Sequence, residues 1–151
     1  GTGNTGGGGY GSQYKEGYCG QSHPLASYAG MISRMDRSIG KILDLLDELK
    51  LAENTLVIFS SDNGPSPEGG QSLKFFNSAG PLSGAKRSWR EGGIRVPMIA
   101  RWKGKIKPGR TSDHPSAFWD FLPTVCEAAG IEIPAGIDGI SYLSQFPGGN
   151  N

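Results

Sequence analysis

The chain contains one continuous β-branched and apolar run, Thr55-Leu56-Val57-Ile58-Phe59-Ser60-Ser61, which stops abruptly at Asp62-Asn63-Gly64-Pro65. The run is too short for a helix, and its composition is typical of a β-strand. Because no polar residue interrupts its apolar part, the run predicts a central strand that is covered on both faces.

An amphipathic helix is predicted before this strand, between Tyr28 and Lys50, with Pro24 suited to its first turn. The apolar residues recur at spacings of three and four, as on one face of a helix. They are Tyr28, Met31, Ile32, Met35, Ile39, Ile42, Leu43, Leu46 and Leu49. We interpret Met31 and Met35 as core packing rather than as ligands.

The segments after the strand predict a loop, a second strand and a short helix. Ser66 to Ala85 is rich in Gly, Pro, Ser and Asn, and so long an unpatterned connection is typical of a functional or mobile loop. Arg95 to Trp102 predicts the second strand, and Asp120 is expected to cap a helix that ends at Gly130. The order of elements predicts an α/β fold, with a mixed sheet flanked by helices.

Composition and charge exclude several classes of function. The 151 residues carry 15 basic and 14 acidic side chains, which argues against a nucleic-acid binder that relies on bulk charge. No apolar run reaches the roughly 20 residues of a membrane span, and the first residues do not resemble a leader. With 25 glycines in the chain, we expect a Gly-rich flexible tail at 1–20, one domain at 21–147 and a polar tail at 148–151.

The end of the apolar strand is a candidate metal site. Ligands of open α/β sheets bind at the carboxyl ends of strands, where Asp62 and Asn63 stand. A carboxylate and an amide oxygen suit Ca²⁺ or Mg²⁺. The alternative is that Asp62 to Pro65 is an ordinary turn, which its composition also favours.

A cationic loop leads into the second strand and is a candidate anion site. Ser83 to Pro97 carries Lys86, Arg87 and Arg90 among glycines. Backbone amides at glycines and a lysine head group can hold a tetrahedral oxyanion. The alternative is a solvated basic surface.

Taken in order, these motifs resemble the sulfatase family. The resemblance rests on a strand ending in Asp62-Asn63-Gly64, on Gly84-Ala85-Lys86 and on Glu91-Gly92-Gly93-Ile94-Arg95-Val96-Pro97, and it extends from Tyr28 to Leu143. It implies the carboxyl-terminal part of a catalytic domain with an alkaline-phosphatase-like fold, which hydrolyses sulfate esters with the help of a divalent cation, usually calcium. It further implies that Asp62 and Asn63 are metal ligands and that Lys86 contacts the sulfate.

The resemblance also shows what this sequence lacks. The family's nucleophile is a formylglycine made from the cysteine of a Cys-x-Pro/Ala-x-Arg motif, and neither Cys19 nor Cys126 stands in one. We therefore expect the chain by itself to be inactive. His23 is a candidate for the family's histidine near the leaving group, or else a capping or surface residue, and His114 is interpreted as structural.

Two other functions stay open at this point. One is a phosphoesterase or phosphomutase of the same superfamily, and the other is a non-catalytic module that binds sulfated glycans through Lys86, Arg87 and Arg90. The resemblance implies an aryl sulfate, a sulfated sugar or a glycan as substrate, no nucleic-acid or membrane partner, and periplasmic or secreted placement. Trp89 is a further candidate for lining the substrate pocket.

Overall fold

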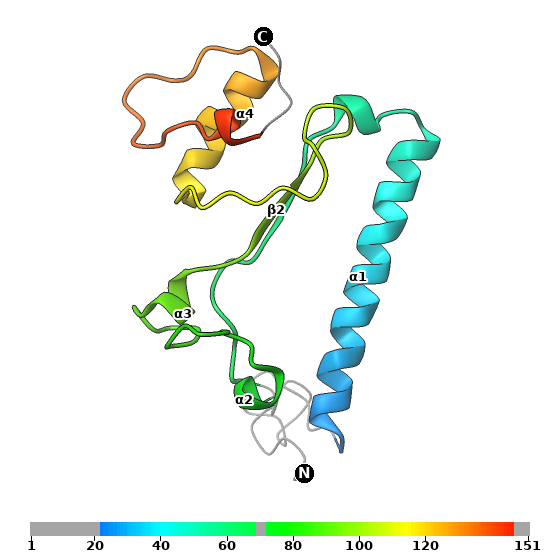
Figure 1. Ribbon diagram of the computed structural model, residues 1–151, viewed down its shortest axis with the longest axis vertical. Helices are drawn as coiled ribbons and strands as arrows, with labels where there is room; N and C mark the ends of the chain where they lie inside the picture. The colour runs from blue at the N-terminus through cyan, green and yellow to red at the C-terminus, as the bar shows by residue number, and fades with distance from the viewer. Residues whose placement is uncertain (1–21, 69–71, 147–151) are drawn as a thin grey trace, which may run out of the picture. The chain divides into compact units, whose positions relative to one another are not determined.

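The computed structural model describes residues 22–68 and 72–146 (Figure 1), so the predicted tails at 1–20 and 148–151 and Cys19 lie outside the described residues. The described helices and strands follow in the order α1 (Pro24–Glu48), β1 (Val57–Ser60), α2 (Leu73–Phe76), α3 (Glu91–Ile94), β2 (Met98–Arg101) and α4 (Phe121–Ala129). Short 3-10 turns stand at η1 (Ala52–Asn54), η3 (Phe118–Asp120) and η4 (Leu143–Gln145). This alternation confirms the α/β class, and none of the described helices has the length and hydropathy needed to cross a bilayer.

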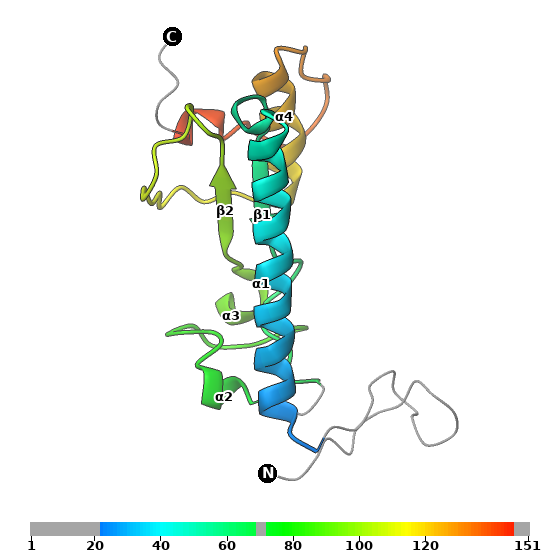
Figure 2. The same ribbon diagram turned by 90° about the vertical axis from the view of Figure 1, so that its right-hand side faces the viewer.

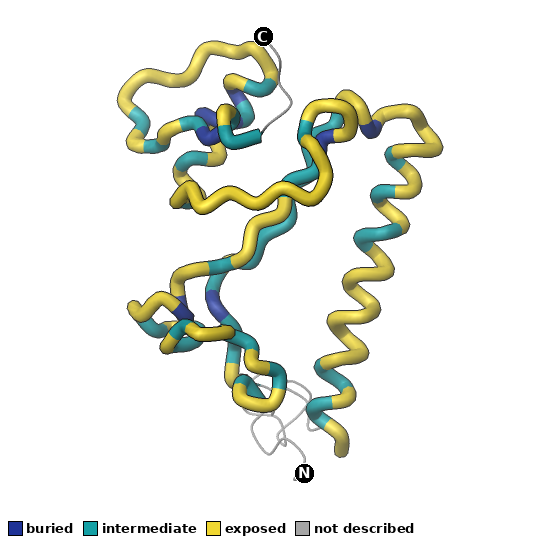
Figure 3. The backbone as a smooth tube through the Cα atoms, in the orientation of Figure 1, coloured by how far each residue is buried: buried dark blue, intermediate teal, exposed yellow. Residues whose placement is uncertain are grey.

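Helix α1 begins earlier than its apolar stripe, because Pro24 occupies the first turn, where its missing N–H costs no hydrogen bond. The helix stops at Glu48, and Lys50 follows with a left-handed φ of 57°. Five of the nine residues of the apolar stripe are exposed (Figure 3), and Met31 and Met35 are 67% and 43% exposed. The interpretation of these two methionines as core packing therefore does not hold within the described residues.

Strands β1 and β2 pair into a two-stranded antiparallel sheet (Figure 2). All four residues of β1 are half-buried, so the described residues do not cover the strand fully on both faces. The hydroxyl of Ser60 donates to the carbonyl of Pro97 at 3.0 Å. Because the strands run in opposite directions, the carboxyl end of β1 lies beside the amino end of β2, so the two candidate motifs emerge at the same edge.

The chain divides into two compact units with different interiors. The first unit is Gly1–Leu46 with Ile58–Ile99, and the second is Asp47–Val57 with Ala100–Asn151. Among the described residues, the buried apolar side chains belong to the second unit, and they are Ala52, Trp102, Pro123, Cys126 and Tyr142. Among the described residues of the first unit, those that are buried are Gly64, Gly92 and Gly93. The described interior of the first unit is therefore made of closely packed backbone rather than of large side chains.

Asp120 organises the start of α4 in the second unit, although not as the predicted helix cap. Its carboxylate accepts from the backbone N–H groups of Ala117 at 2.8 Å and Ile140 at 2.9 Å, and makes no side-chain cap bond to α4 itself. It therefore holds the chain on both sides of the helix. The helix ends as predicted at Gly130, whose φ of 68° places it in the left-handed region that glycine adopts without strain.

Thr124 links α4 to the segment that follows it. Its side chain is fully buried, its hydroxyl donates to the carbonyl of Asp120 at 2.6 Å, and it accepts from the backbone N–H of Tyr142 at 3.0 Å. Burial, together with the negative charge of Asp120, raises the pKa of the Tyr142 phenol. One hydroxyl thus satisfies two backbone groups at the centre of the second unit.

We expect Thr124→Val to destabilise the protein by about 1–3 kcal/mol, because the change removes the acceptor of a buried N–H while keeping the side-chain volume. Thr55→Val is the matched control, since the Thr55 hydroxyl makes one exposed bond to the carbonyl of Leu51. Urea denaturation of both variants checks this. Equal midpoints for the two variants would contradict the role of Thr124.

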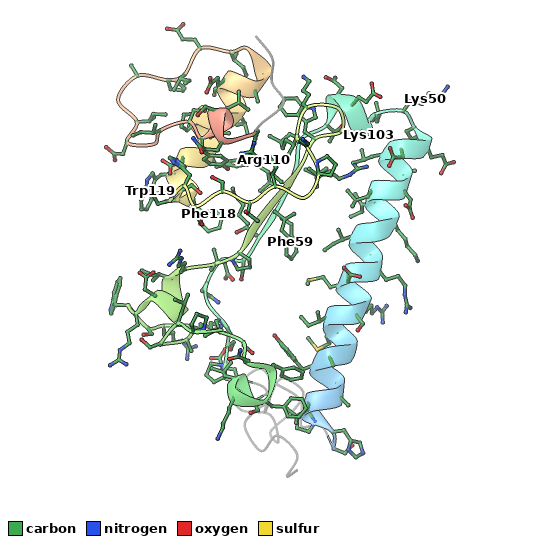
Figure 4. The ribbon with its side chains drawn as sticks, viewed as in Figure 1. Lys50, Phe59, Lys103, Arg110, Phe118 and Trp119 are labelled. Atoms are coloured by element: carbon green, nitrogen blue, oxygen red, sulfur yellow. The ribbon has the colours of Figure 1, made fainter. Side chains whose placement is uncertain are left out.

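A charged cluster in the second unit joins the end of α1 to the end of β2 and the residues that follow it. The carboxylate of Asp47 accepts from Arg101 at 3.0 Å and from Lys103 at 2.6 Å, and Figure 4 labels Lys103. The hydrogen bond from Lys103 is the main cause that lowers the pKa of Asp47. All three side chains are about a third exposed or more, so solvent screens the cluster and it adds little to stability.

Candidate functional site

Backbone hydrogen bonds join the two candidate motifs within the first unit. The N–H of Gly64 donates to the carbonyl of Gly93 at 2.8 Å, and the N–H of Lys86 donates to the carbonyl of Pro65 at 3.0 Å. The N–H of Gly92 donates to the carbonyl of Ser83 at 2.8 Å. The loop after β1, the cationic loop and α3 therefore form one hydrogen-bonded structure, although the sequence separates them.

Three glycines allow this close approach. A Cβ atom added to Gly64 would collide with the carbonyl of Gly92, and one added to Gly93 would collide with the carbonyl of Ser88. At Gly92 it would stand 2.5 Å from the carbonyl of Gly84. Each obstacle is backbone, which cannot move aside as a flexible side chain can. Gly64 thus allows the loop after β1 to approach α3, and Gly92 and Gly93 allow α3 to approach the cationic loop.

Asp62 and Asn63 stand directly after β1, at the edge of this junction. Asp62 is exposed, and the side-chain amide nitrogen of Asn63 donates to the carbonyl of Gly64 at 2.9 Å. The amide nitrogen is a donor only, so the amide oxygen of Asn63 is the atom that can bind a cation. Because the two oxygens are hard donors, the pair fits a divalent cation such as calcium.

The pair supplies only part of a metal site. Within residues 22–68 and 72–146, no group of three or more His, Cys, Asp or Glu side chains is arranged to hold a metal ion. Calcium takes six to eight oxygen ligands, so a complete site requires donors besides Asp62 and Asn63.

Lys86 forms an ion pair that the sequence did not predict. Its ammonium group lies 2.9 Å from one carboxylate oxygen of Glu68, and the guanidinium of Arg87 lies 2.8 Å from the other. The side chains of Lys86 and Glu68 are 30% and 22% exposed, whereas that of Arg87 is 76% exposed. Arg87 also has a left-handed φ of 72°, which is unusual for a residue with a side chain.

Ser66 holds Glu68 in turn. Its hydroxyl donates to a carboxylate oxygen of Glu68 at 3.0 Å and accepts from the backbone N–H of Glu68 at 3.2 Å. The loop that begins with Asp62 therefore continues into the carboxylate that contacts Lys86. Sequence reasoning missed Glu68 because it treated Ser66 to Ala85 as one unpatterned loop; the available signal was a lone acid in a loop that faces a Lys-Arg pair.

The other predicted residues occupy separate places. His23 is exposed directly before α1, where its carbonyl accepts from the N–H of Ser27 at 2.9 Å. His114 is exposed, and its backbone N–H donates to the hydroxyl of Ser112 at 3.2 Å. Cys126 is buried in α4 as a free thiol. Trp89 is 94% exposed.

A cavity of about 210 Å³ lies in the second unit, and none of the predicted site residues lines it. Its lining includes Trp102 and Lys105, and the ammonium group of Lys105 lies over the Trp102 ring in a cation–π contact, 4.0 Å from the ring centroid. The candidate site is thus an open junction of loops in the first unit rather than this cavity.

An α/β chain with an Asp-Asn pair that offers hard oxygen atoms and a lysine in an adjoining loop has features that suit an enzyme domain acting on an oxyanion. The Sulfatase family model matches residues 4–131, and the chain therefore belongs to the sulfatase family. The chain is 39% identical to steryl-sulfatase of Mus musculus over 126 residues, which cover 81% of this chain and 20% of that protein. It is 38% identical to N-acetylgalactosamine-6-sulfatase of Canis lupus familiaris over 128 residues, which cover 81% of this chain and 23% of that protein.

A solved structure agrees with this assignment. The structure of Ps i-CgsB in complex with k-i-k-neocarrahexaose superposes with a TM-score of 0.72 at 32% identity, over 83% of this chain and 27% of that chain. The alkaline-phosphatase-like α/β fold predicted from the sequence is thereby confirmed. The chain spans about a fifth of the length of the curated relatives that it matches.

Proposed function

We propose that residues 21–147 form the carboxyl-terminal part of a sulfatase catalytic domain and that the complete enzyme hydrolyses a sulfate ester. The observation that carries the proposal is the hydrogen-bonded junction between the Asp62–Pro65 loop and the Lys86 loop. It brings the backbones of the candidate metal ligands and the candidate sulfate-contacting lysine into one structure. A fixed arrangement of this kind is what electrostatic catalysis requires.

In this proposal each residue has a separate task. The oxygens of Asp62 and Asn63 hold a divalent cation, for which calcium is the candidate. When bound, the cation withdraws charge from the oxygens of the sulfate group and so favours cleavage of the ester. Lys86 places its positive charge beside the same oxygens. His23 is a candidate for donating a proton to the leaving alcohol, and the formylglycine nucleophile is expected elsewhere in the complete enzyme.

The proposed substrate class follows from what the relatives share. Two of them are a steryl-sulfatase and an N-acetylgalactosamine-6-sulfatase, and the solved structure is a complex with k-i-k-neocarrahexaose. Their organic groups differ, and the sulfate ester is common to the two named enzymes. We therefore assign this chain to a sulfate ester without choosing the alcohol, and we expect a periplasmic or secreted enzyme.

Calcium removal tests the proposal. The complete reading frame that contains this chain is purified and assayed with para-nitrophenyl sulfate, before and after chelation. We expect chelation to abolish hydrolysis and added calcium to restore it. Asp62→Asn should lower activity at limiting calcium by at least about tenfold, the size seen when partners outside the first ligand sphere are lost. Asp113→Asn, in an exposed loop of the second unit, is the matched control.

Two results would overturn the assignment. Activity toward phosphate esters alone would favour the phosphoesterase alternative. Salt-sensitive binding of sulfated polymers, with no hydrolysis by the complete protein, would favour the binding module.

A further inference from the structure

We infer that Glu68 positions Lys86 and lowers the positive charge beside it, so that Glu68 shifts the preference of the site toward a singly charged sulfate ester and away from a doubly charged phosphate ester. This inference rests on the proposed function of Lys86. It adds a residue that neither the motifs nor the sequence analysis singled out. The starting observation is the contact of one carboxylate with the two adjacent cationic side chains Lys86 and Arg87.

The positioning role follows from the contacts of Glu68 on both sides. The Ser66 hydroxyl donates to the carboxylate and accepts from the backbone N–H of Glu68, and the carboxylate holds the Lys86 ammonium group at 2.9 Å. The backbone of Lys86 is held independently by the carbonyl of Pro65. A long lysine side chain that is anchored at both ends loses less conformational freedom when it binds an anion.

The charge role follows from the count of charges in the cluster. Lys86 and Arg87 contribute two positive charges and Glu68 one negative charge, so Glu68 lowers by one unit the positive charge that these side chains present to an anion. A phosphate monoester dianion carries more negative charge than a sulfate monoester, so it loses more from the presence of Glu68. Since an anion on Lys86 must lie within several ångströms of Glu68, each additional negative charge on it meets additional repulsion.

Exposure decides which contact matters more. Arg87 is 76% exposed, so water and salt screen its charge, whereas Lys86 and Glu68 are less than a third exposed. Removal of the Glu68 charge should therefore change anion preference more than removal of the Arg87 charge. The two changes should also act in opposite directions.

Two inhibitors of the same shape test the inference in the complete enzyme. Benzenesulfonate carries one negative charge, and phenylphosphonate carries two at alkaline pH. We expect Glu68→Gln to shift the ratio of their inhibition constants by about tenfold toward phenylphosphonate, since one unit of charge is removed close to the anion. Glu68→Asp should restore part of the preference. Glu132→Gln, which removes an exposed carboxylate in the second unit, should leave the ratio unchanged.

Arg87→Met keeps the inference testable if Glu68→Gln does not fold. This variant should shift the ratio by about twofold in the opposite direction, toward benzenesulfonate, because the remaining cluster is neutral. A ratio within experimental error of the wild type in a folded Glu68→Gln variant would overturn the inference. Failure of the unsubstituted enzyme to hydrolyse para-nitrophenyl sulfate would instead overturn the proposed function.

Discussion

Gly64→Ala is expected to destabilise the protein by about 3 kcal/mol or more, because overpacking against rigid backbone lies at the severe end of single substitutions. The added Cβ would collide with the carbonyl of Gly92, while the N–H of Gly64 is bonded to the carbonyl of Gly93. To make room, the loop after β1 and α3 must separate. We therefore expect a lower denaturation midpoint together with weaker calcium binding.

Gly40→Ala is the matched control, because its added Cβ meets nothing within 4 Å on α1. In a helix this change should stabilise by roughly 0.5–1 kcal/mol, since glycine loses more backbone freedom than alanine on folding. The two variants carry the same chemical change and should shift the denaturation midpoint in opposite directions. A Gly64→Ala protein as stable as the wild type would show that the close junction does not exist in solution.

Lys86→Met is expected to lower kcat/KM for a sulfate ester by at least about a hundredfold, the cost of removing one preorganised group that stabilises transition-state charge. Methionine keeps an unbranched apolar side chain, and the backbone bond from Lys86 to Pro65 does not depend on the side chain. The loop should therefore keep its conformation, and the loss should appear in turnover rather than in the denaturation midpoint.

Steady-state kinetics on para-nitrophenyl sulfate provide the measurement. Lys74→Met, on the exposed part of α2, removes a lysine from the same unit and should leave the kinetics unchanged. If Lys86→Met retained most of the wild-type kcat/KM, Lys86 would not contact the reacting sulfate.

Periodicity predicted the longer elements well. The apolar stripe identified α1, the uninterrupted run identified β1, and Gly130 identified the end of α4. Both strands are shorter than predicted, because residues at their ends have β-type composition without a partner strand to pair with. The four-residue helices α2 and α3 were not predicted, since one turn of helix is too short to show a repeat of 3.6 residues.

The roles of individual polar residues were harder to predict. Asp120 was expected to cap α4, yet its carboxylate accepts from the backbone N–H groups of Ala117 and of Ile140, the latter twenty positions along the chain.

The exposure of large side chains was also hard to predict. Phe118 and Trp119, which Figure 4 labels near the start of α4, are 63% and 68% exposed despite their size. Hydrogen bonds and burial between distant segments depend on how the chain folds back, which local patterns do not encode.

The amino-acid order alone determined the family of this chain, its α/β class and the candidate residues Asp62, Asn63 and Lys86, because each depends on residue types at short, fixed spacings. Only the tertiary structure decided that Gly64 faces Gly93 and that Glu68 holds Lys86. Those contacts join residues 29 and 18 positions apart, as their numbering shows. They form because β1 and β2 are antiparallel, so the chain leaves the sheet at the carboxyl end of β1 and re-enters it beside that point, at the amino end of β2. The connecting loops therefore pack against each other at this end of the sheet.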